Sequence, residues 1–331
     1  MESTGSVPRT MKAIRYERFG RPDVLELRDV EVPSAADDQV LLRVRASSVN
    51  PVEWYTVSGL LVGRFRNGLR RPKNSAVGAD VSGVVEAVGK DVRELEVGDE
   101  VFGTCGGAWA EYARAREVRL VPKPVNVSFE EAAALPIAAL TALQALRDKG
   151  RVQSGQKVLI NGASGGVGTY AVQLAKELGA DVTAVCSTPN VDLVRSLGAD
   201  EVVDYRREDF TRRAGRYDLM LDVAGNRSFL KLRRVIKPDG TIVVVGAPRG
   251  GRVLGPVGHV IGMRALSLGR SQTVVFFVSK IEKDDLRLLA DLLAAGKLKS
   301  VVDRRYELRQ ASEALAYLGE GHARAKVVLT M

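Results

Sequence analysis

The chain has 331 residues, of which 45% are hydrophobic and 27% charged, and its formal net charge at pH 7 is +9. This length favours two domains over one core, and no apolar run reaches the roughly 18 residues of a membrane span, so we predict no membrane partner. The two cysteines, Cys105 and Cys186, are too few for a disulfide framework, and residues 1–10 lack the apolar segment of a secretory signal. We therefore expect a cytoplasmic protein whose first ten residues form a tail.

The excess of basic residues is dispersed along the chain and mixed with acidic ones. Its densest stretch, residues 64–73, is short and lacks the aromatic interleaving of proteins that bind single-stranded nucleic acid. We interpret this stretch as a solvated loop and predict no nucleic-acid partner. A positive field also attracts an anionic cofactor.

Short strands separated by Gly, Pro and Asp are the pattern of the first third of the chain. They are expected at residues 11–16, 24–30, 39–47, 81–89, 99–103, 108–113 and 118–122. Closely spaced short strands of this kind predict an antiparallel, barrel-like domain.

An alternation of strands and helices follows a helical segment at residues 130–150, which Pro136 interrupts. Strands are expected at residues 157–161, 181–187, 201–205, 217–223 and 241–247, and helices at 165–179, 188–198 and 226–236. Thr188 is the expected N-cap of the second helix, with Pro189 at its first position. Alternating βα units with apolar strands predict a parallel, doubly wound sheet in an α/β protein.

The last part of the chain changes pattern again near residue 271. A strand at 272–279 and an amphipathic helix at 282–297 are followed by segments 301–308, 311–319 and 326–331. We place the domains at residues 1–132, 133–275 and 276–331.

A glycine-rich turn, NGASGGVGTYA, follows the strand at 157–161 and opens a helix, which is the context that a dinucleotide fingerprint requires. Its spacing, Gly162-x-x-Gly165-x-x-Gly168, is one residue wider at the start than the usual G-x-G-x-x-G. Small residues let the backbone approach a pyrophosphate, and the helix N-terminus offers free N–H groups and partial positive charge. A tight turn in an α/β domain that binds nothing is the alternative.

The end of the next strand distinguishes between the two dinucleotides. A carboxylate there would bind the ribose of NAD, but the chain reads Cys186-Ser187-Thr188 and has no acid. Ser187 and Asn190 can donate hydrogen bonds to a phosphate, and Tyr205 is placed to close the site. We therefore predict NADPH, with Cys186 packed against adenosine. Simple turn and cap roles for Ser187 and Thr188 are the alternative.

Several longer stretches carry a resemblance to a known family: SSVNPVEWYTVSG, VGADVSGVVEAVG, VGDEVFG, AAALPIAALTALQAL, NGASGGVGTYAVQLAKELGA, SLGADEVVDY and ARAKVVL. The chain resembles the zinc-free branch of the medium-chain dehydrogenase/reductase superfamily, and within it the quinone oxidoreductases of the zeta-crystallin type near the reticulon-interacting oxidoreductase subgroup. The resemblance implies a GroES-like β-barrel catalytic domain, an inserted Rossmann cofactor domain, and a C-terminal return to the catalytic domain. It also implies a homodimer joined at sheet edges, for which residues 274–279 offer an apolar edge strand.

The ligands of a zinc site are missing from this chain. By resemblance, the first ligand of the zinc enzymes falls within residues 50–53, which hold no Cys, and their Gly-His-Glu stretch reads Gly78-Ala79-Asp80. The two histidines, His259 and His322, pair with no cysteine at a zinc spacing. We predict no metal. In the absence of a Lewis acid, the reduction of an electron-poor acceptor is easier than the oxidation of an alcohol.

The same resemblance implies the site residues. Asn50 and Tyr55 are the expected catalytic residues, since an amide and a phenol hold and polarise a carbonyl. Glu53 stands where the family often has Asp, and a solvated acid is its alternative. The expected cofactor contacts are Asn50, Thr141, Gly162, Ala163, Ser164, Gly165, Gly166, Val167, Cys186, Ser187, Asn190, Tyr205, Val223, Gly246, Ala247, Phe277, Arg324 and Lys326. A core role for Tyr55, a turn role for Asn50, a buried-strand role for Phe277 and surface positions for Arg324 and Lys326 stay open.

We predict a zinc-independent, NADPH-dependent oxidoreductase that transfers hydride or electrons to quinones or α,β-unsaturated carbonyls. A pathway-specific enoyl reductase is an alternative. A NADPH-binding scaffold, sensor or RNA-associated protein without catalysis is another, from a different class. No residue separates quinone from enone chemistry.

Overall fold

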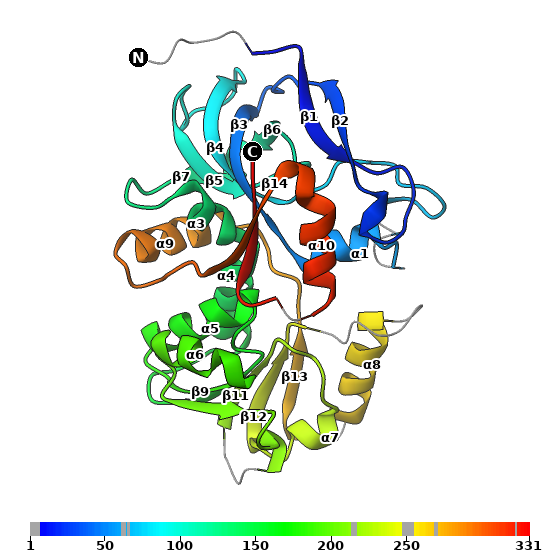
Figure 1. Cartoon of the computed structure of the whole chain (residues 1–331). Helices are drawn as coiled ribbons and strands as arrows, with labels where there is room; N and C mark the ends of the chain where they lie inside the picture. Colours follow the sequence, from blue (N-terminus) through cyan, green and yellow to red (C-terminus); the bar gives the residue numbers. More distant parts are fainter. Residues whose placement is uncertain are drawn as a thin grey trace. The chain divides into compact units, whose positions relative to one another are not determined.

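The computed structural model describes residues 7–60, 64, 67–212, 217–246, 255–267, 271–321 and 323–331, without the side chains of 255–260. The chain divides into two compact units. Unit 1 comprises Met1–Ile137, Ile281–Gly296 and Ser300–Met331, and unit 2 comprises Ala138–Lys280 and Lys297–Lys299. Figure 1 shows the elements of each unit, coloured along the chain.

Unit 1 is built on a largely antiparallel sheet of seven strands in the order β14-β15-β3-β4-β5-β7, with β6 paired to β3. A separate pair joins β1 and β2. The strands are β1 (Thr10–Arg15), β2 (Glu26–Glu31), β3 (Gln39–Val49), β4 (Asp80–Val88), β5 (Glu100–Thr104), β6 (Tyr112–Arg116), β7 (Leu120–Pro122), β14 (Val302–Glu307) and β15 (Lys326–Thr330). This arrangement confirms the antiparallel domain expected from the short strands.

Three helices of unit 1 pack on strands of its sheet, and a fourth, α1, packs on one of those helices. They are α1 (Pro51–Val57), α3 (Phe129–Ala134), α9 (Lys283–Ala294) and α10 (Ala311–Gly319). The indole of Trp54 on α1 lies so close to Gly319 that a Cβ at Gly319 would clash with it. Trp54 also packs at the edge of a core that includes Val49, Trp109 and Leu315. The close packing of α1 on α10 fixes the helix on which the predicted catalytic residue Tyr55 lies.

Unit 2 contains a six-stranded sheet in the order β10-β9-β8-β11-β12-β13, and every pairing is parallel. The strands are β8 (Lys157–Asn161), β9 (Asp181–Cys186), β10 (Glu201–Asp204), β11 (Tyr217–Asp222), β12 (Ile236–Val244) and β13 (Thr273–Phe276). The strand order reverses direction between β8 and β11, which is the switch point where doubly wound sheets bind ligands.

Helices lie on both sides of this sheet. Figure 1 shows α5 (Gly166–Glu177) and α6 (Val191–Ser196) on one side, with α7 (Phe229–Leu232) and α8 (Gly255–Ser267) on the other. The helix α4 (Pro136–Gln144) begins in unit 1 and runs into unit 2, where a π-turn at Ala145–Lys149 follows it. The doubly wound fold predicted from the βα alternation is therefore confirmed.

Local differences from the predicted elements have simple causes. The predicted helix 188–198 begins instead with a 3-10 turn at Thr188–Asn190 whose N-cap is Ser187, so Thr188 is not the cap. Its hydroxyl donates to the Asp204 carboxylate at 2.6 Å, a bond across neighbouring strands that no local pattern reveals. The strand predicted at 272–279 ends at Phe276.

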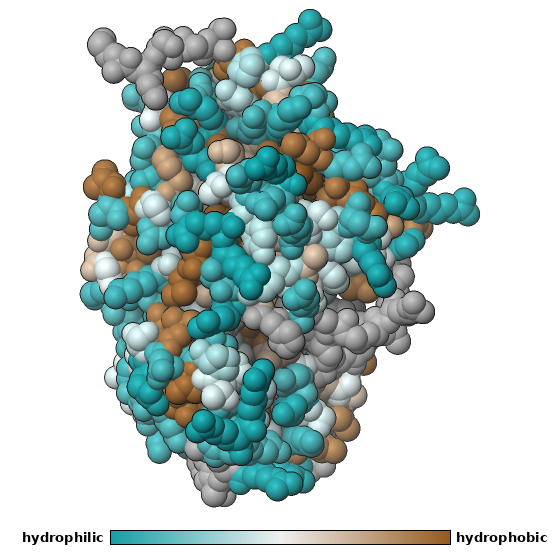
Figure 2. Space-filling model, in the orientation of Figure 1, coloured by the Kyte–Doolittle hydropathy of each residue, from teal (hydrophilic) through white to brown (hydrophobic). Residues whose placement is uncertain are grey.

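No helix among the described residues is long and apolar enough to cross a membrane. Figure 2 shows a mainly hydrophilic face on which apolar side chains form small separate groups.

Candidate cofactor and active site

The glycine turn lies between β8 and α5 in unit 2, as its spacing predicted. Gly162 adopts a φ of +88°, in the left-handed region that favours glycine. The backbone N–H of Gly165 then donates to the Gly162 carbonyl at 3.1 Å, which closes the turn. Helix α5 begins at Gly166, and its N-cap, Gly165, makes no side-chain capping bond. The first N–H groups of α5 are therefore uncapped by any side chain.

Two glycines of this turn have different roles. A Cβ at Gly168 would clash with the Gly162 carbonyl oxygen and with Ala163, so this glycine lets the helix pack tightly on the turn. A Cβ at Gly165 would meet only the Gly162 oxygen, at an ordinary 3.5 Å. Packing therefore does not require glycine at 165.

Three residues predicted to bind the cofactor meet at the end of β9. The Asn190 amide nitrogen donates to the Ser187 hydroxyl at 3.0 Å and to the Ser164 hydroxyl at 3.1 Å. Asn190 Oδ1 is buried and has no hydrogen-bond partner among the described residues. These contacts join the glycine turn to the end of β9 in one polar cluster, in which the buried Asn190 oxygen keeps an unused hydrogen-bonding capacity.

The end of β10 lies beside the end of β9 in the sheet of unit 2. The backbone N–H of Tyr205 donates to the Cys186 carbonyl at 3.0 Å, and the Tyr205 side chain is exposed. Asp204, whose role the sequence did not suggest, is buried and accepts bonds from the Thr188 hydroxyl and the Arg206 N–H. These bonds, led by that of Thr188, lower the pKa of Asp204. The carboxylate is thus charged and already engaged in holding the β9 and β10 ends together.

The carboxyl ends of β8, β11 and β12 are joined by Asp222, which is fully buried. Its Oδ1 accepts from the Asn161 amide at 2.7 Å and from the Gly225 N–H at 3.0 Å. Its backbone carbonyl accepts from the Gly246 N–H at 3.1 Å, and a Cβ at Gly246 would clash with the Val223 carbonyl. Val223 and Gly246 therefore lie together, as expected for neighbours at one edge. Ala247 lies outside the described residues.

Thr141 and Phe277, two further predicted contacts, lie where α4 meets the segment after β13. The Thr141 hydroxyl donates to the Ser279 hydroxyl at 3.0 Å. The Gln144 side chain accepts from the Lys280 N–H and donates to its carbonyl, each at 2.9 Å. The Phe277 ring is half-buried, with the Lys149 ammonium 5.8 Å from its centroid.

In unit 1, Asn50 lies in a buried cluster of polar side chains. Its Oδ1 accepts from the Lys326 ammonium at 2.6 Å, and its Nδ2 donates to Asp80 Oδ2 at 2.9 Å. Asp80 also accepts from the Ser48 hydroxyl at 2.6 Å and from the Ile137 N–H at 3.0 Å. The ammonium itself is 3.5 Å from Asp80 Oδ2. Lys326 is 2% exposed, so the alternative of a surface lysine is wrong.

Glu53 belongs to the same cluster and is 4% exposed, so it is not a solvated acid. Its Oε2 accepts from the Asn50 N–H at 2.8 Å, whereas its Oε1 is buried without a partner among the described residues. Burial, reinforced by the nearby Asp80 charge, raises the pKa of Glu53 to about 8. Burial also lowers the pKa of Lys326, against the opposing attraction of Asp80. At neutral pH the cluster thus holds a protonated Glu53.

Tyr55 and Arg324 are the two other predicted residues of unit 1. Tyr55 is half-buried on α1, about one helical turn after Pro51. Arg324 is exposed, and its backbone N–H donates to Asp303 Oδ2 at 3.0 Å. Asp80 and Ser48 are the residues that sequence reasoning did not assign to the site, although the stretch VGADVSG that contains Asp80 carried the family resemblance.

Comparison with protein families places these features in a known context. The family model of the alcohol dehydrogenase GroES-like domain matches residues 36–125, and that of the zinc-binding dehydrogenases matches residues 197–329.

Individual relatives match almost the whole chain. The 2-methylene-furan-3-one reductase of Solanum lycopersicum is 35% identical over 98% of this chain and 80% of its own. The chloroplastic NADPH-dependent alkenal/one oxidoreductase of Arabidopsis thaliana is 34% identical, with the same shares, 98% and 80%. The solved quinone oxidoreductase from Coxiella burnetii shares 31% identity and a TM-score of 0.85, over 97% of this chain and 99% of that one. The chain belongs to the quinone oxidoreductase branch of the medium-chain dehydrogenase/reductase superfamily.

This membership confirms the predicted family and fold, and makes the chain an oxidoreductase. The placement near the reticulon-interacting subgroup stays a prediction. In this oxidoreductase the described residues contain no group of three or more His, Cys, Asp or Glu side chains that could hold a metal ion. His322 and the side chain of His259 lie outside the described part. The absence of zinc therefore stays a prediction too.

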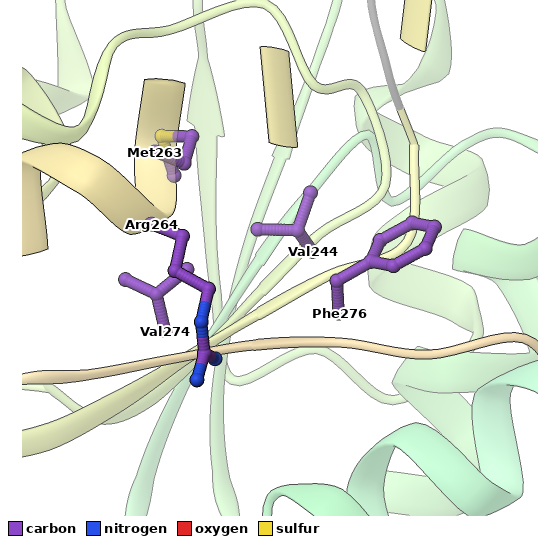
Figure 3. Close-up of a pocket in the computed structure, with 5 residues that line it drawn as sticks. All are labelled: Val244, Met263, Arg264, Val274 and Phe276. Atoms are coloured by element: carbon purple, nitrogen blue, oxygen red, sulfur yellow. The ribbon is translucent and has the colours of Figure 1, made fainter. Parts of the chain in front are cut away.

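The oxidoreductase also has a cavity of about 210 Å³ at the ends of β12 and β13, lined by Val244, Met263, Arg264, Val274 and Phe276. Figure 3 shows the apolar side chains around it, with Met263 and Arg264 contributed by α8 and Phe276 by the end of β13. Phe276 lines this cavity, and the contact of Phe277 with the cofactor stays a prediction.

Proposed function

We propose that this oxidoreductase binds NADPH and reduces quinones or α,β-unsaturated carbonyl compounds. The observation that supports it most directly is the polar cluster of Ser164, Ser187 and Asn190 beside the uncapped start of α5. The cluster contains hydroxyl and amide groups, and β9 ends without a carboxylate that would repel a 2′-phosphate. The Arabidopsis relative named as NADPH-dependent adds support from outside the chain.

The orientation of the Asn190 amide bears on phosphate binding, because O and N of an amide are assigned from the hydrogen bonds they make. With the amide rotated by 180°, its oxygen would accept from the Ser164 and Ser187 hydroxyls. Its NH₂ group would then stand where the unpartnered Oδ1 now lies. In that orientation the side chain carries N–H donors at this position, which a phosphate oxygen needs, in place of an acceptor that would repel it.

When bound, NADPH supplies the hydride from its nicotinamide ring. The proposed role of Gly162–Val167 is to hold the pyrophosphate against the start of α5, where the helix dipole favours negative charge. In unit 1, Asn50 orients cofactor and acceptor, and the Tyr55 hydroxyl donates a hydrogen bond to the acceptor carbonyl as its oxygen gains charge. Arg324, on the surface, remains a proposed contact for the cofactor phosphates.

The test is a binding titration of the purified protein with NADPH and NADH. We expect NADPH to bind more tightly by roughly tenfold or more, since a charge-assisted phosphate contact contributes 1.4 kcal/mol or more. Equal affinities would remove the support from Ser164, Ser187 and Asn190.

We also propose a cytoplasmic homodimer. Both cysteines are free and buried, which fits a reducing compartment. Strand β13 is an edge of the parallel sheet, with Phe276 47% exposed and Val278 73% exposed beyond it. An apolar sheet edge pairs readily with a second copy. Light scattering on the purified protein should give twice the mass of the chain, and a monomer at micromolar concentration would contradict the proposal.

A further inference from the structure

The hydrogen bonds around Asn50 allow one orientation of its amide. In the observed orientation the oxygen faces the Lys326 ammonium and the nitrogen faces the Asp80 carboxylate. Rotation by 180° would point the NH₂ group at an ammonium and the oxygen at a carboxylate, and both contacts would be repulsive. Two charged neighbours of opposite sign therefore fix an orientation that neutral neighbours would leave open.

The fold brings Lys326 to this position by strand pairing. β15 is antiparallel to β3, with Val327 opposite Val49, so Lys326 stands beside the residue that follows β3, Asn50. Ala325, directly before Lys326, has a φ of +51° and is 4% exposed. A non-glycine residue in this conformation is strained, and such strain persists only where the surroundings determine it, often at functional sites.

Stability alone does not explain a buried charge pair at this place. The Lys326 side chain is 3% exposed and that of Asp80 is 0% exposed. Removing such charges from water costs several kcal/mol, and apolar replacements of a buried pair are often neutral or stabilising. The two charged groups instead contact the Asn50 amide, one at its oxygen and one at its nitrogen.

We propose that Lys326 and Asp80 are positioning residues of the reductase, which act by holding the Asn50 amide in one orientation. This inference rests on the proposed function, in which Asn50 contacts cofactor and acceptor. The Lys326 ammonium is buried, donates to Asn50 Oδ1 and lies 3.5 Å from Asp80 Oδ2, so in this proposal it acts through Asn50 rather than on the cofactor phosphates. The interaction between Lys326 and Asn50 should then appear as non-additive kinetics.

The experiment is a double-mutant cycle with Asn50→Ala, Lys326→Met and both together. For each protein, kcat, KM for the acceptor and Kd for NADPH are measured. We expect each single change to lower kcat/KM about 10- to 100-fold, as for misplaced groups that act as a unit. The kcat/KM of the double variant should lie within about twofold of that of the less active single variant. Losses that multiply would mean that Lys326 acts independently of Asn50, and would overturn the proposal.

Three controls distinguish a positioning role of Lys326 from a role in stability alone. Lys123→Met removes another buried lysine of unit 1, whose ammonium is 2.9 Å from Glu100 and donates to the Val127 carbonyl at 2.7 Å. This variant should keep kcat/KM within about twofold of the wild type, and a loss as large as that of Lys326→Met would contradict the proposal. Lys326→Arg keeps the cation and should recover part of the rate.

The third control removes both charges at once. Asp80→Asn combined with Lys326→Met leaves no unpaired buried charge, so its melting temperature should stay near that of the wild type. Its kcat/KM should nevertheless stay low, because nothing then fixes the amide. Full activity in this folded variant would overturn the proposal.

Failure of the proposed function would look different. A wild-type protein that reduces no quinone or enone would contradict the reductase proposal. In that case the double-mutant cycle is evaluated from the Kd of NADPH alone, since Asn50 is also a proposed cofactor contact. Coupled losses of affinity in that cycle support positioning by Lys326, and additive losses contradict it.

Discussion

Ser187 directly follows β9, and its hydroxyl accepts a hydrogen bond from Asn190 at 3.0 Å. Ser187→Asp would place a carboxylate where we propose that NADPH carries its 2′-phosphate. We expect this change to weaken NADPH binding about 10- to 100-fold through like-charge repulsion, with little effect on NADH. Titration with both cofactors measures it, and Ser187→Ala is the control, with a loss of about tenfold or less because a single hydrogen bond is removed. Unchanged NADPH affinity in Ser187→Asp would place the phosphate elsewhere.

Glu53 provides a second test at the level of single residues, the pH dependence of stability. Its pKa is raised from 4.5 to about 8 by burial and the nearby Asp80. Between these two pH values the unfolded chain has lost the proton while the native chain keeps it. The free energy of unfolding therefore falls as pH rises through this window, by an amount on the order of 4 kcal/mol at most. Below pH 4.5 both states are protonated and the group has no effect.

Urea unfolding of the wild type and of Glu53→Gln from pH 5 to pH 8 measures this contribution. The neutral amide of Glu53→Gln does not titrate, so its unfolding free energy should fall less with pH than that of the wild type. Lys326 and Asp80, the charged neighbours, are present in both proteins, and the difference isolates Glu53. Parallel curves for the two proteins would show that Glu53 is ionised in the native state.

At the scale of elements, the turn between β8 and α5 contains one glycine that packing requires and one that we assign to cofactor binding. A Cβ at Gly165 has room, so Gly165→Ala should leave the melting temperature nearly unchanged while it weakens NADPH binding about tenfold or more. Gly168→Ala should lower both the melting temperature and the affinity for NADPH, because its Cβ meets the Gly162 carbonyl and costs about 1–3 kcal/mol of stability. Thermal unfolding and NADPH titration of both variants test the distinction. Equal stability losses would mean that both glycines serve packing only.

The sequence predicted the elements wherever a local pattern decides them. The βα alternation, the turn at Gly162 and the break at Pro136 all depend on residues close in the chain, and α3 and α4 meet at that proline. The 3-10 turn at Thr188–Asn190 was not predicted, because the Thr188 hydroxyl bonds to Asp204 on the neighbouring strand.

The same distinction applies to the site. Ser164, Ser187 and Asn190 were predicted as separate contacts, and their meeting follows from the parallel pairing of β8 and β9. The cluster around Asn50 was out of reach of sequence reasoning, since Asp80 and Lys326 are 246 residues apart and their burial depends on the strands that flank β3. Only a three-dimensional arrangement shows that a lysine near the chain end is buried.

At the scale of the whole molecule, catalysis should not depend on a metal ion. Prolonged treatment with a strong chelator, followed by desalting, should leave the rate of NADPH oxidation unchanged, because no step of the proposed reduction needs a Lewis acid. Elemental analysis of the same sample is the control. Stoichiometric zinc that is lost together with activity would contradict this prediction.

The measurement that tests the central claim most directly is NADPH consumption by the purified chain with 1,4-quinones, 2-alkenals and 2-enones, with NADH in parallel. We predict turnover of at least one of these classes with NADPH, and slower turnover with NADH. The class that reacts also names the substrate type. Tight NADPH binding without turnover of any acceptor would contradict the reductase and favour a NADPH-binding role without catalysis.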